Sequence, residues 1–159
     1  MLPLPSMNKP REDHRLIKQY LDKNVYEATE ERLDYLFREF DNIYVSFSGG
    51  KDSGLLLNLV LDFKRRNYPR RTVGVFHQDF EAQYTVTTEY ITRTFKRLER
   101  EAELYWICLP MATRTALSSY EMFWYPWDDH KPDAWVRPMP VHPYVINMEH
   151  PAKYYRYRM

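Results

Sequence analysis

The feature that most constrains this chain is a strand pattern that runs into a polar loop and then into a helical pattern. Residues 43–47, Ile-Tyr-Val-Ser-Phe, include large apolar and β-branched side chains that predict a short buried strand. From Gly54 onward, leucine, valine and phenylalanine recur at spacings of three and four residues, which predicts a helix with one buried face. The sequence Ser-Gly-Gly-Lys-Asp-Ser at 48–53 therefore connects the end of a strand to the beginning of a helix.

This loop has the residue types that hold a phosphate group. Its glycine pair lets the backbone turn sharply and approach a ligand, because no Cβ stands in the way. The loop amides and the free N–H groups of the next helix then point outward together and favour an anion. Ser48 and Ser53 add hydroxyl donors, and Lys51 adds a positive charge. Asp52 would repel a phosphate unless a cation such as Mg2+ lay between them, so the loop predicts a site for magnesium pyrophosphate.

The spacing differs from the Walker A loop and from the Gly-x-Gly-x-x-Gly fingerprint. It resembles instead the PP-loop, Ser-Gly-Gly-x-Asp-Ser, of the adenine nucleotide alpha hydrolase superfamily. That resemblance implies binding of ATP or a related adenylate with Mg2+, and cleavage or transfer at the alpha phosphate with release of pyrophosphate. It assigns the nucleotide and pyrophosphate to Ser46, Ser48, Gly49, Gly50, Lys51, Asp52, Ser53 and Asp79, with Lys51 and Asp52 as catalytic residues and Asp52 as the Mg2+ ligand. The alternative is a Gly-Ser turn that merely precedes a helix.

Helical and strand patterns alternate along the first two thirds of the chain. We expect helices over residues 13–22, 24–41, 54–66 and 84–100, and strands over residues 43–47, 72–77 and 104–109. This alternation predicts a three-layer α/β/α domain with a parallel sheet and helices on both faces. Ligands in such sheets bind beyond the carboxyl ends of the strands, where the loop at 48–53 and Asp79 both fall.

The whole chain of 159 residues is expected to form one domain. Its parts are an N-terminal arm and helices (1–41), a βαβαβ core (42–110) and an irregular aromatic-rich extension (111–159). In the extension we expect a short helix over 112–120 and a further strand within 141–148. Its Trp, Tyr and Pro residues predict a contact surface over 120–159 for a protein partner or a second copy. The alternative is that these aromatic residues fold back over the chain's own sheet.

Three side chains outside the loop are further candidates for binding. Asp79 and Glu81 follow the strand at 72–77, and either would bind ribose hydroxyls or the metal, or else cap a helix. Arg137 would bind an anionic group of a substrate, or else pair with a carboxylate. His77 is a weaker candidate, because a histidine at a strand end is more often packed and hydrogen-bonded than catalytic.

The chain looks most like the phosphoadenosine phosphosulfate reductase branch of the superfamily. Reductases of that branch use a cysteine in a C-terminal tail, whereas this chain ends in Lys-Tyr-Tyr-Arg-Tyr-Arg-Met. Its one cysteine, Cys108, lies in a predicted apolar strand and is interpreted as a small buried hydrophobe, so thiol-dependent reduction is not expected. The Trp-Val-Arg-Pro sequence at 135–138 resembles a subgroup of co-activators that act with a ParB-like partner (immunoglobulin-binding regulator type). Members of that subgroup are usually longer, which predicts a truncated chain or a sheet completed by another chain.

Composition limits the remaining possibilities. The net charge of +1 gives no general electrostatic case for nucleic acid or membrane. One cysteine and the lack of a long apolar run predict a cytoplasmic protein. Direct nucleic-acid binding through the basic residues at 64–66, 70–71 and from Lys153 onward is a third, less favoured interpretation. Two main hypotheses remain: an enzyme acting at the alpha phosphate of ATP, and a nucleotide-binding regulatory subunit with little catalysis of its own.

Overall fold

The structure, a computed structural model, describes residues 20–149 of the chain. Its helices are α1 (Val25–Glu39), α2 (Lys51–Asn67) and α3 (Thr85–Leu98), with a short 3-10 helix η1 (Pro132–Ala134). Its strands are β1 (Tyr44–Ser46), β2 (Gly74–Gln78), β3 (Glu103–Ile107), β4 (Thr113–Arg114), β5 (Phe123–Trp124) and β6 (Val145–Ile146). The predicted helix over 13–22 falls mostly outside the described residues, and residues 20–24 are not helical. Within residues 20–149, no helix has the length and apolar character needed to cross a membrane.

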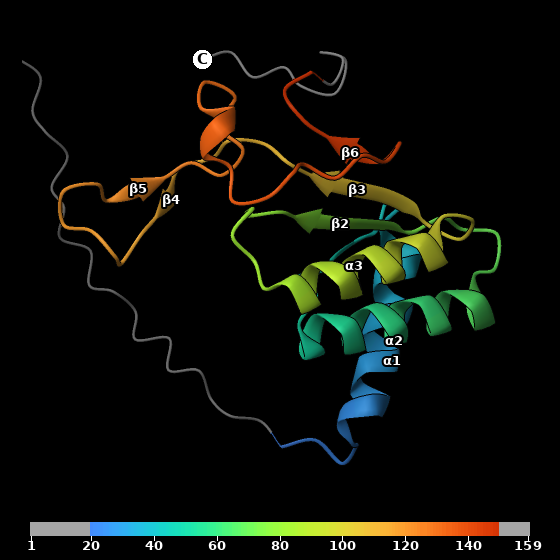
Figure 1. The fold of residues 1–159 in the computed structure, drawn as a ribbon. Helices are drawn as coiled ribbons and strands as arrows, with labels where there is room; N and C mark the ends of the chain where they lie inside the picture. The colour runs from blue at the N-terminus through green and yellow to red at the C-terminus, as the bar shows by residue number, and fades with distance from the viewer. Residues whose placement is uncertain (1–19, 150–159) are drawn as a thin grey trace, which may run out of the picture.

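A four-stranded parallel sheet in the order β1-β2-β3-β6 forms the centre of the fold (Figure 1). Val45 in β1 lies opposite Val75 in β2, and Val75 lies opposite Leu104 in β3, which sets the register of these three strands. Strand β6 pairs with β3 through Trp106 and Val145, which confirms the strand predicted within 141–148. The α/β class with a parallel sheet is therefore confirmed.

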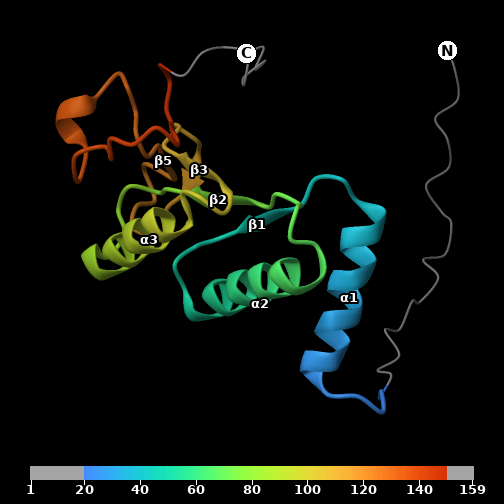
Figure 2. The ribbon, with the colours of Figure 1, turned by 90° about the vertical axis from the view of Figure 1, so that its right-hand side faces the viewer.

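The crossover helices lie on one face of the sheet. Figures 1 and 2 both show α2 and α3 beneath the strands. The strands β1, β2 and β3 are neighbours in chain order, so two crossovers of the usual right-handed sense bring both helices to the same side. On the side of the strands away from α2 and α3, Figures 1 and 2 show the C-terminal extension, which contributes the short helix η1 among the described residues.

Helix α1 packs beside α2 at the β1 side of the sheet (Figure 2). Asn24 begins α1 with a reciprocal capping box, because its side chain accepts from the Glu27 amide while the Glu27 side chain accepts from the Asn24 amide. The buried ring of Phe37 then lies 5.5 Å from the ring of Phe63 in α2. This packing fixes the helix that follows the loop at 48–53.

The C-terminal extension divides into a packed part and a projecting part. Trp127 is 1% exposed and belongs to the core, as the fold-back interpretation expected. The short helix predicted over 112–120 is wrong, because β4 pairs there with β5 in an antiparallel hairpin. This hairpin projects from the body in Figure 1, and its connecting residues Leu117 and Tyr120 are 98% and 97% exposed. The fold-back interpretation therefore holds for Trp127, whereas a contact surface on the exposed hairpin stays a prediction.

Candidate functional site at the carboxyl ends of the strands

The residues at 48–53 follow β1 at the carboxyl edge of the sheet, as the sequence predicts, but α2 begins at Lys51 and not at residue 54, so Lys51, Asp52 and Ser53 form its first turn. Gly50 is the N-cap of α2 and supplies no side-chain cap. Within residues 20–149, the amides of Lys51, Asp52 and Ser53 have no hydrogen-bond acceptor, because the first ladder bond of α2 starts at the Gly54 amide. Three unsatisfied donors at a helix N-terminus form a local positive potential that suits an anion.

Gly49 is the residue that gives the loop its shape. Its φ of +81° lies in the left-handed region that favours glycine. A Cβ built there would lie 2.8 Å from Ile91 Cγ1 and 2.9 Å from Thr87 Cγ2, both on α3. The loop backbone therefore lies directly against α3, and a side chain at this position would push the two apart.

The two serines of the loop bond to each other and to the loop backbone. Ser48 Oγ and Ser53 Oγ lie 3.0 Å apart, and the Ser48 amide donates to Ser53 Oγ at 3.2 Å. Ser53 Oγ also donates to the Gly50 carbonyl at 3.0 Å, and the Gly50 amide donates to Ser48 Oγ at 3.3 Å. These bonds fix the conformation of residues 48–53, so a ligand that bound there would not have to order them.

Lys51 and Asp52 stand in solvent at the mouth of the loop. Their side chains are 91% and 88% exposed, and Lys51 Nζ lies 2.9 Å from an Asp52 carboxylate oxygen. Both are therefore accessible to a ligand, and Asp52 has a carboxylate that could hold a hard cation. Ser46 is less well placed, because it is exposed on β1 next to the buried Val45 and so faces the side of the sheet away from α2.

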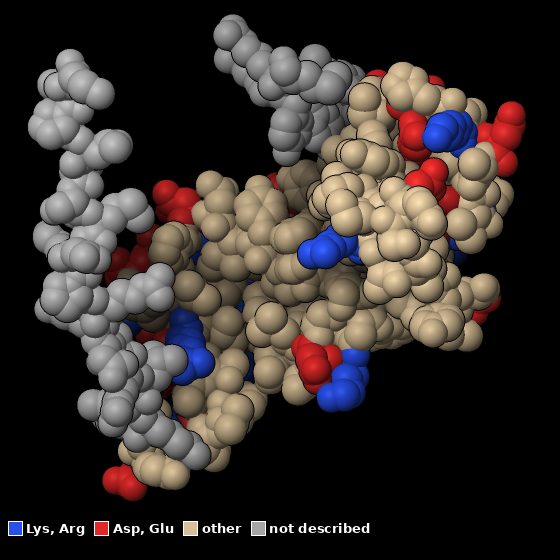
Figure 3. Space-filling view, turned by 90° about the vertical axis from the view of Figure 1, so that its left-hand side faces the viewer, with Lys and Arg blue, Asp and Glu red and all other residues tan. Residues whose placement is uncertain are grey.

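Figure 3 looks onto the carboxyl edge of the sheet, and most of the described surface there is neither acidic nor basic. A bound anion at this edge would thus depend on the loop amides and on Lys51 rather than on a broad basic surface. One group of three potential metal ligands occurs in the described residues, Asp128, Asp129 and His130, and it lies in the C-terminal extension rather than beside the loop.

Asp79 follows β2 and is the centre of a buried polar network. It is 0% exposed, and both of its carboxylate oxygens accept from Arg137 Nη2 at 2.6 Å. Trp106 Nε1 donates to the same carboxylate at 2.7 Å, and the Glu81 amide donates to it at 2.8 Å. The carboxylate of Asp79 is fully used by the chain itself and offers no free oxygen to a ribose or a metal ion in this structure.

Glu81 holds the C-terminal extension in the same way. It is 2% exposed, with a φ of +63°, and its carboxylate accepts from the Trp127 amide at 2.7 Å and the Val136 amide at 2.5 Å. Its carbonyl accepts from Arg137 Nε at 3.0 Å. The expected ligand contacts of Glu81 are therefore replaced by contacts to the extension, and the same holds for most of the Arg137 side chain.

The tryptophans of this network are hydrogen-bond partners of Asp79 that the sequence interpretation missed. Trp127 Nε1 donates to the Asp79 carbonyl at 2.9 Å, and the Arg137 guanidinium lies over the Trp127 ring, 4.8 Å from its centroid. The available signal was two carboxylates directly after a strand, and an arginine close to tryptophans in the aromatic-rich extension. Asp79, Glu81, Trp127 and Arg137 together form what we name the β2-end clamp, which ties residues 127–137 to the sheet.

His77 and Cys108 lie inside the fold next to this clamp. His77 is fully buried, its Nδ1 lies 2.9 Å from the Phe47 carbonyl, and burial lowers its pKa. It thus holds the end of β1 at the position where the loop begins. Cys108 is also fully buried, and burial, with the nearby Asp79 charge, raises the pKa of its thiol. Both positions fit the packed interpretation of these residues.

A surface hollow of about 430 Å3 lies beside α3, away from the loop at 48–53. Its lining residues are Gln83, Thr85, Thr88, Glu89, Thr92, Arg93 and Arg137. Arg137 therefore reaches this hollow with the part of its guanidinium that the clamp leaves accessible.

The structure defines an α/β protein in which three amides without acceptors begin the helix that follows β1 at the sheet edge. The chain is similar to the uncharacterized protein YbdN of Escherichia coli (strain K12), with 37% identity over 123 residues. The match covers 76% of this chain and 29% of YbdN, so the chain spans less than a third of that relative. No family model and no solved structure matches the chain.

Proposed function

We propose that the chain binds Mg2+-complexed ATP, or a related adenylate, at the loop 48–53. The observation that carries this proposal is the combination of a Ser-Gly-Gly-Lys-Asp-Ser sequence with its place between a parallel strand and a helix whose first amides lack acceptors. The left-handed Gly49 and the hydrogen-bonded pair Ser48 and Ser53 support it, because they fix the backbone that leads into the free amides of α2. A cytoplasmic location, where ATP and Mg2+ are both available, belongs to the same proposal.

The reaction we propose is cleavage or transfer at the alpha phosphate, with release of pyrophosphate. Ser48, Gly49, Gly50 and Ser53 would hold the pyrophosphate, and Lys51 would neutralise charge that develops on it. Asp52 would hold Mg2+, which supplies further charge neutralisation. Catalysis of this kind rests on positioning and electrostatic stabilisation. The β2-end clamp would act indirectly, by fixing the sheet edge on which the loop lies.

Calorimetric titration with Mg-ATP tests this proposal. Lys51→Ala should lower the affinity at least tenfold while leaving the unfolding midpoint unchanged, because the lysine side chain is 91% exposed. Lys131→Ala removes the same charge from an exposed position in the extension and should bind as the wild type does. Folded wild-type protein that shows no heat of binding with Mg-ATP would end the proposal. Release of pyrophosphate in the same samples distinguishes binding from turnover.

A second candidate function is a nucleotide-binding regulatory subunit, or a co-activator that acts with a ParB-like or other protein partner. The projecting β4–β5 hairpin favours it, because a two-stranded hairpin with exposed apolar side chains is marginally stable without a partner. This function predicts Mg-ATP binding with little release of pyrophosphate by the chain alone. Measurable turnover by the isolated chain would favour the enzyme instead.

A further inference from the structure

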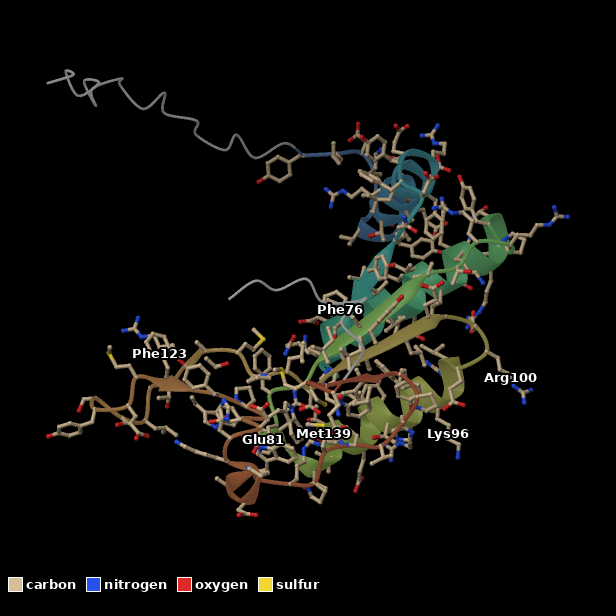
Figure 4. All side chains as sticks on the ribbon, turned by 90° about the horizontal axis from the view of Figure 1, so that it is seen from above. Phe76, Glu81, Lys96, Arg100, Phe123 and Met139 are labelled. Carbon is tan, nitrogen blue, oxygen red and sulfur yellow. The ribbon has the colours of Figure 1, made fainter. Side chains whose placement is uncertain are left out.

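The outer face of α3 carries four cationic side chains that form no ion pair within residues 20–149. They are Arg93, Lys96, Arg97 and, just beyond the helix, Arg100, which we name the α3 ridge. Their spacings of three, four and seven residues place them on one face, and all four are exposed. Figure 4 shows Lys96 and Arg100 extending outward, away from the sheet.

The basic residues at 64–66 and 70–71 stand out in the sequence, but three of them, Arg65, Arg66 and Arg71, bind other parts of the chain. Arg65 donates to both carboxylate oxygens of Glu101 at 2.6 and 2.7 Å, and Arg66 donates to Glu30 at 2.8 Å. Arg71 donates to backbone carbonyls at the end of α1, including that of Asp41 at 2.6 Å. These cations connect neighbouring elements, so they are not available to a partner in the way that the α3 ridge is.

The arrangement of the α3 ridge places like charges near one another on one side of the helix. Arg93 and Arg97 are like charges at i and i+4 within α3, a spacing that destabilises a helix by a few tenths of a kcal/mol. The helix dipole favours cations in the last turn, which covers Lys96 and Arg97 but not Arg93. The nearby Glu101 is held by Arg65, whose hydrogen bond is the main cause of its lowered pKa.

We infer that the α3 ridge binds the sugar–phosphate backbone of a nucleic acid. Arg93 and Arg100 are seven residues apart, about 10 Å along a helix, which is a length comparable to a few successive phosphates of one strand. Contacts of this kind carry no base recognition, so we expect binding to be independent of sequence and sensitive to salt. A membrane surface fits less well, because an interfacial helix needs large apolar side chains beside its cations, whereas Glu89, Thr92 and Glu99 lie beside these.

This inference does not depend on nucleotide binding by the loop. The two sites nevertheless share α3, since its Thr87 and Ile91 support Gly49 in the first half of the helix while the ridge occupies the second half. A nucleic acid on the ridge would therefore lie along the helix that backs the loop.

Fluorescence anisotropy with a labelled DNA duplex of about 20 base pairs, and with an RNA strand of similar length, tests the inference. The ridge variant is R93Q/K96Q/R100Q, which leaves Arg97 in place because it lies near Glu101. The matched control is R32Q/R114Q/K131Q, which removes the same charge from exposed positions elsewhere. Between about 50 and 200 mM salt, we expect wild type and control to bind with a steep salt dependence. The ridge variant should bind at least tenfold more weakly, with a slope of log K against log salt smaller by about 2.7, or 0.9 for each of three contacts.

The inference would be overturned if the wild type did not bind nucleic acid at about 50 mM salt, or if the ridge variant kept the wild-type affinity. Equal losses of affinity in the ridge and control variants would also overturn it. So would binding to anionic lipid vesicles without binding to either nucleic acid. Circular dichroism checks that each variant is folded. Mg-ATP titration of the ridge variant should give the wild-type affinity, so a failure of this inference is distinct from a failure of the proposed nucleotide site.

Discussion

Both carboxylate oxygens of Asp79 accept from the same nitrogen of Arg137, Nη2, at 2.6 Å. The pair joins the end of β2 to the C-terminal extension across 58 positions of the chain. Asp79 is fully buried and the Arg137 side chain is 20% exposed, so the pair lies mostly away from water. Removing one partner of such a pair leaves an uncompensated charge, which costs more than the intact pair contributes.

Asp79→Asn should therefore lower the free energy of unfolding by about 3 kcal/mol, measured by urea unfolding at pH 7. Asp62→Asn is the matched control, because Asp62 pairs with Arg66 in an exposed position, where such a pair contributes about 1 kcal/mol or less. Amides of residues 127–137 should exchange faster in the Asp79 variant. If Asp79→Asn loses nucleotide affinity while its stability matches that of the Asp62 control, then Asp79 binds a ligand directly and the clamp interpretation is wrong.

The core of the fold was predictable because local patterns determine it. Alternation in β1, the leucine spacing of α2 and the glycine pair between them follow from neighbouring residues, and the structure confirms this strand–loop–helix unit. The strand within 141–148 was also predictable, since a short β-branched run can extend a parallel sheet. These features depend on sequence periods of two and of three to four residues, which short segments can show.

The clamp was not predictable in the same way, because it depends on contacts between residues far apart in the chain. The spacing of Asp79 and Glu81 after β2 is compatible with ligand binding and with internal pairing, and only the position of Trp127 and Arg137 decides between them. The helix expected over 112–120 failed for a related reason, since the pairing of β4 with β5 overrides a weak local helical pattern. Helices α2 and α3 lie on the same face of the sheet because β1, β2 and β3 are neighbours in chain order. Local sequence patterns do not determine this strand order.

Gly49→Ala should destabilise the protein and weaken nucleotide binding together. A non-glycine residue at a φ of +81° costs about 1–2 kcal/mol, and the added Cβ would also displace Ile91. Gly50→Ala is the matched control, because Gly50 has a φ of −77° and its added Cβ would lie 3.4 Å from Ser48 Oγ. We expect the control to lose less than about 1 kcal/mol. Equal unfolding midpoints for the two variants would contradict the assigned role of Gly49.

His77 should make the stability of the protein fall as the pH drops below about 6.5. Burial lowers its pKa in the folded state, whereas in the unfolded chain the pKa is near 6.5. The unfolded state therefore binds the extra proton first, and stability that is present above that pH is lost below it, by at most about 1.4 kcal/mol per pH unit. Urea unfolding between pH 7.5 and 5.5 should give a flatter dependence for His77→Gln. Parallel curves for the two proteins would show that His77 does not titrate on unfolding.

Cys108 should be chemically silent in the folded protein. Burial raises the pKa of its thiol, and its side chain is enclosed by the core. We expect a thiol reagent such as DTNB to react only after urea unfolds the chain. Cys108→Ala should cost about 1 kcal/mol of stability and leave Mg-ATP binding unchanged. Rapid labelling of the folded protein, or loss of nucleotide binding in folded Cys108→Ala, would contradict this prediction and indicate that the Cys108 thiol is accessible or takes part in binding.

The β4–β5 hairpin should mediate association with another protein or a second copy. Leu117 and Tyr120 are 98% and 97% exposed, so L117S/Y120S should leave the free energy of unfolding within about 0.5 kcal/mol of the wild type. The same double variant should reduce association, measured by light scattering coupled to size exclusion and by pull-down from the native host. Val141→Ser is the matched control, because Val141 is 91% exposed but lies outside the hairpin.

Hydrogen exchange distinguishes a β4–β5 hairpin that needs a partner to be stable from one that is stable in the isolated chain. A hairpin that depends on a partner should exchange its amides rapidly in the isolated chain and become protected when the partner binds, since two strands alone bury little apolar surface. A self-sufficient hairpin should be protected in the monomer. A monodisperse wild-type monomer with strongly protected amides over 113–124, and with no partner recovered, would rule out the interface and leave the exposed aromatic residues of the hairpin without a role in association.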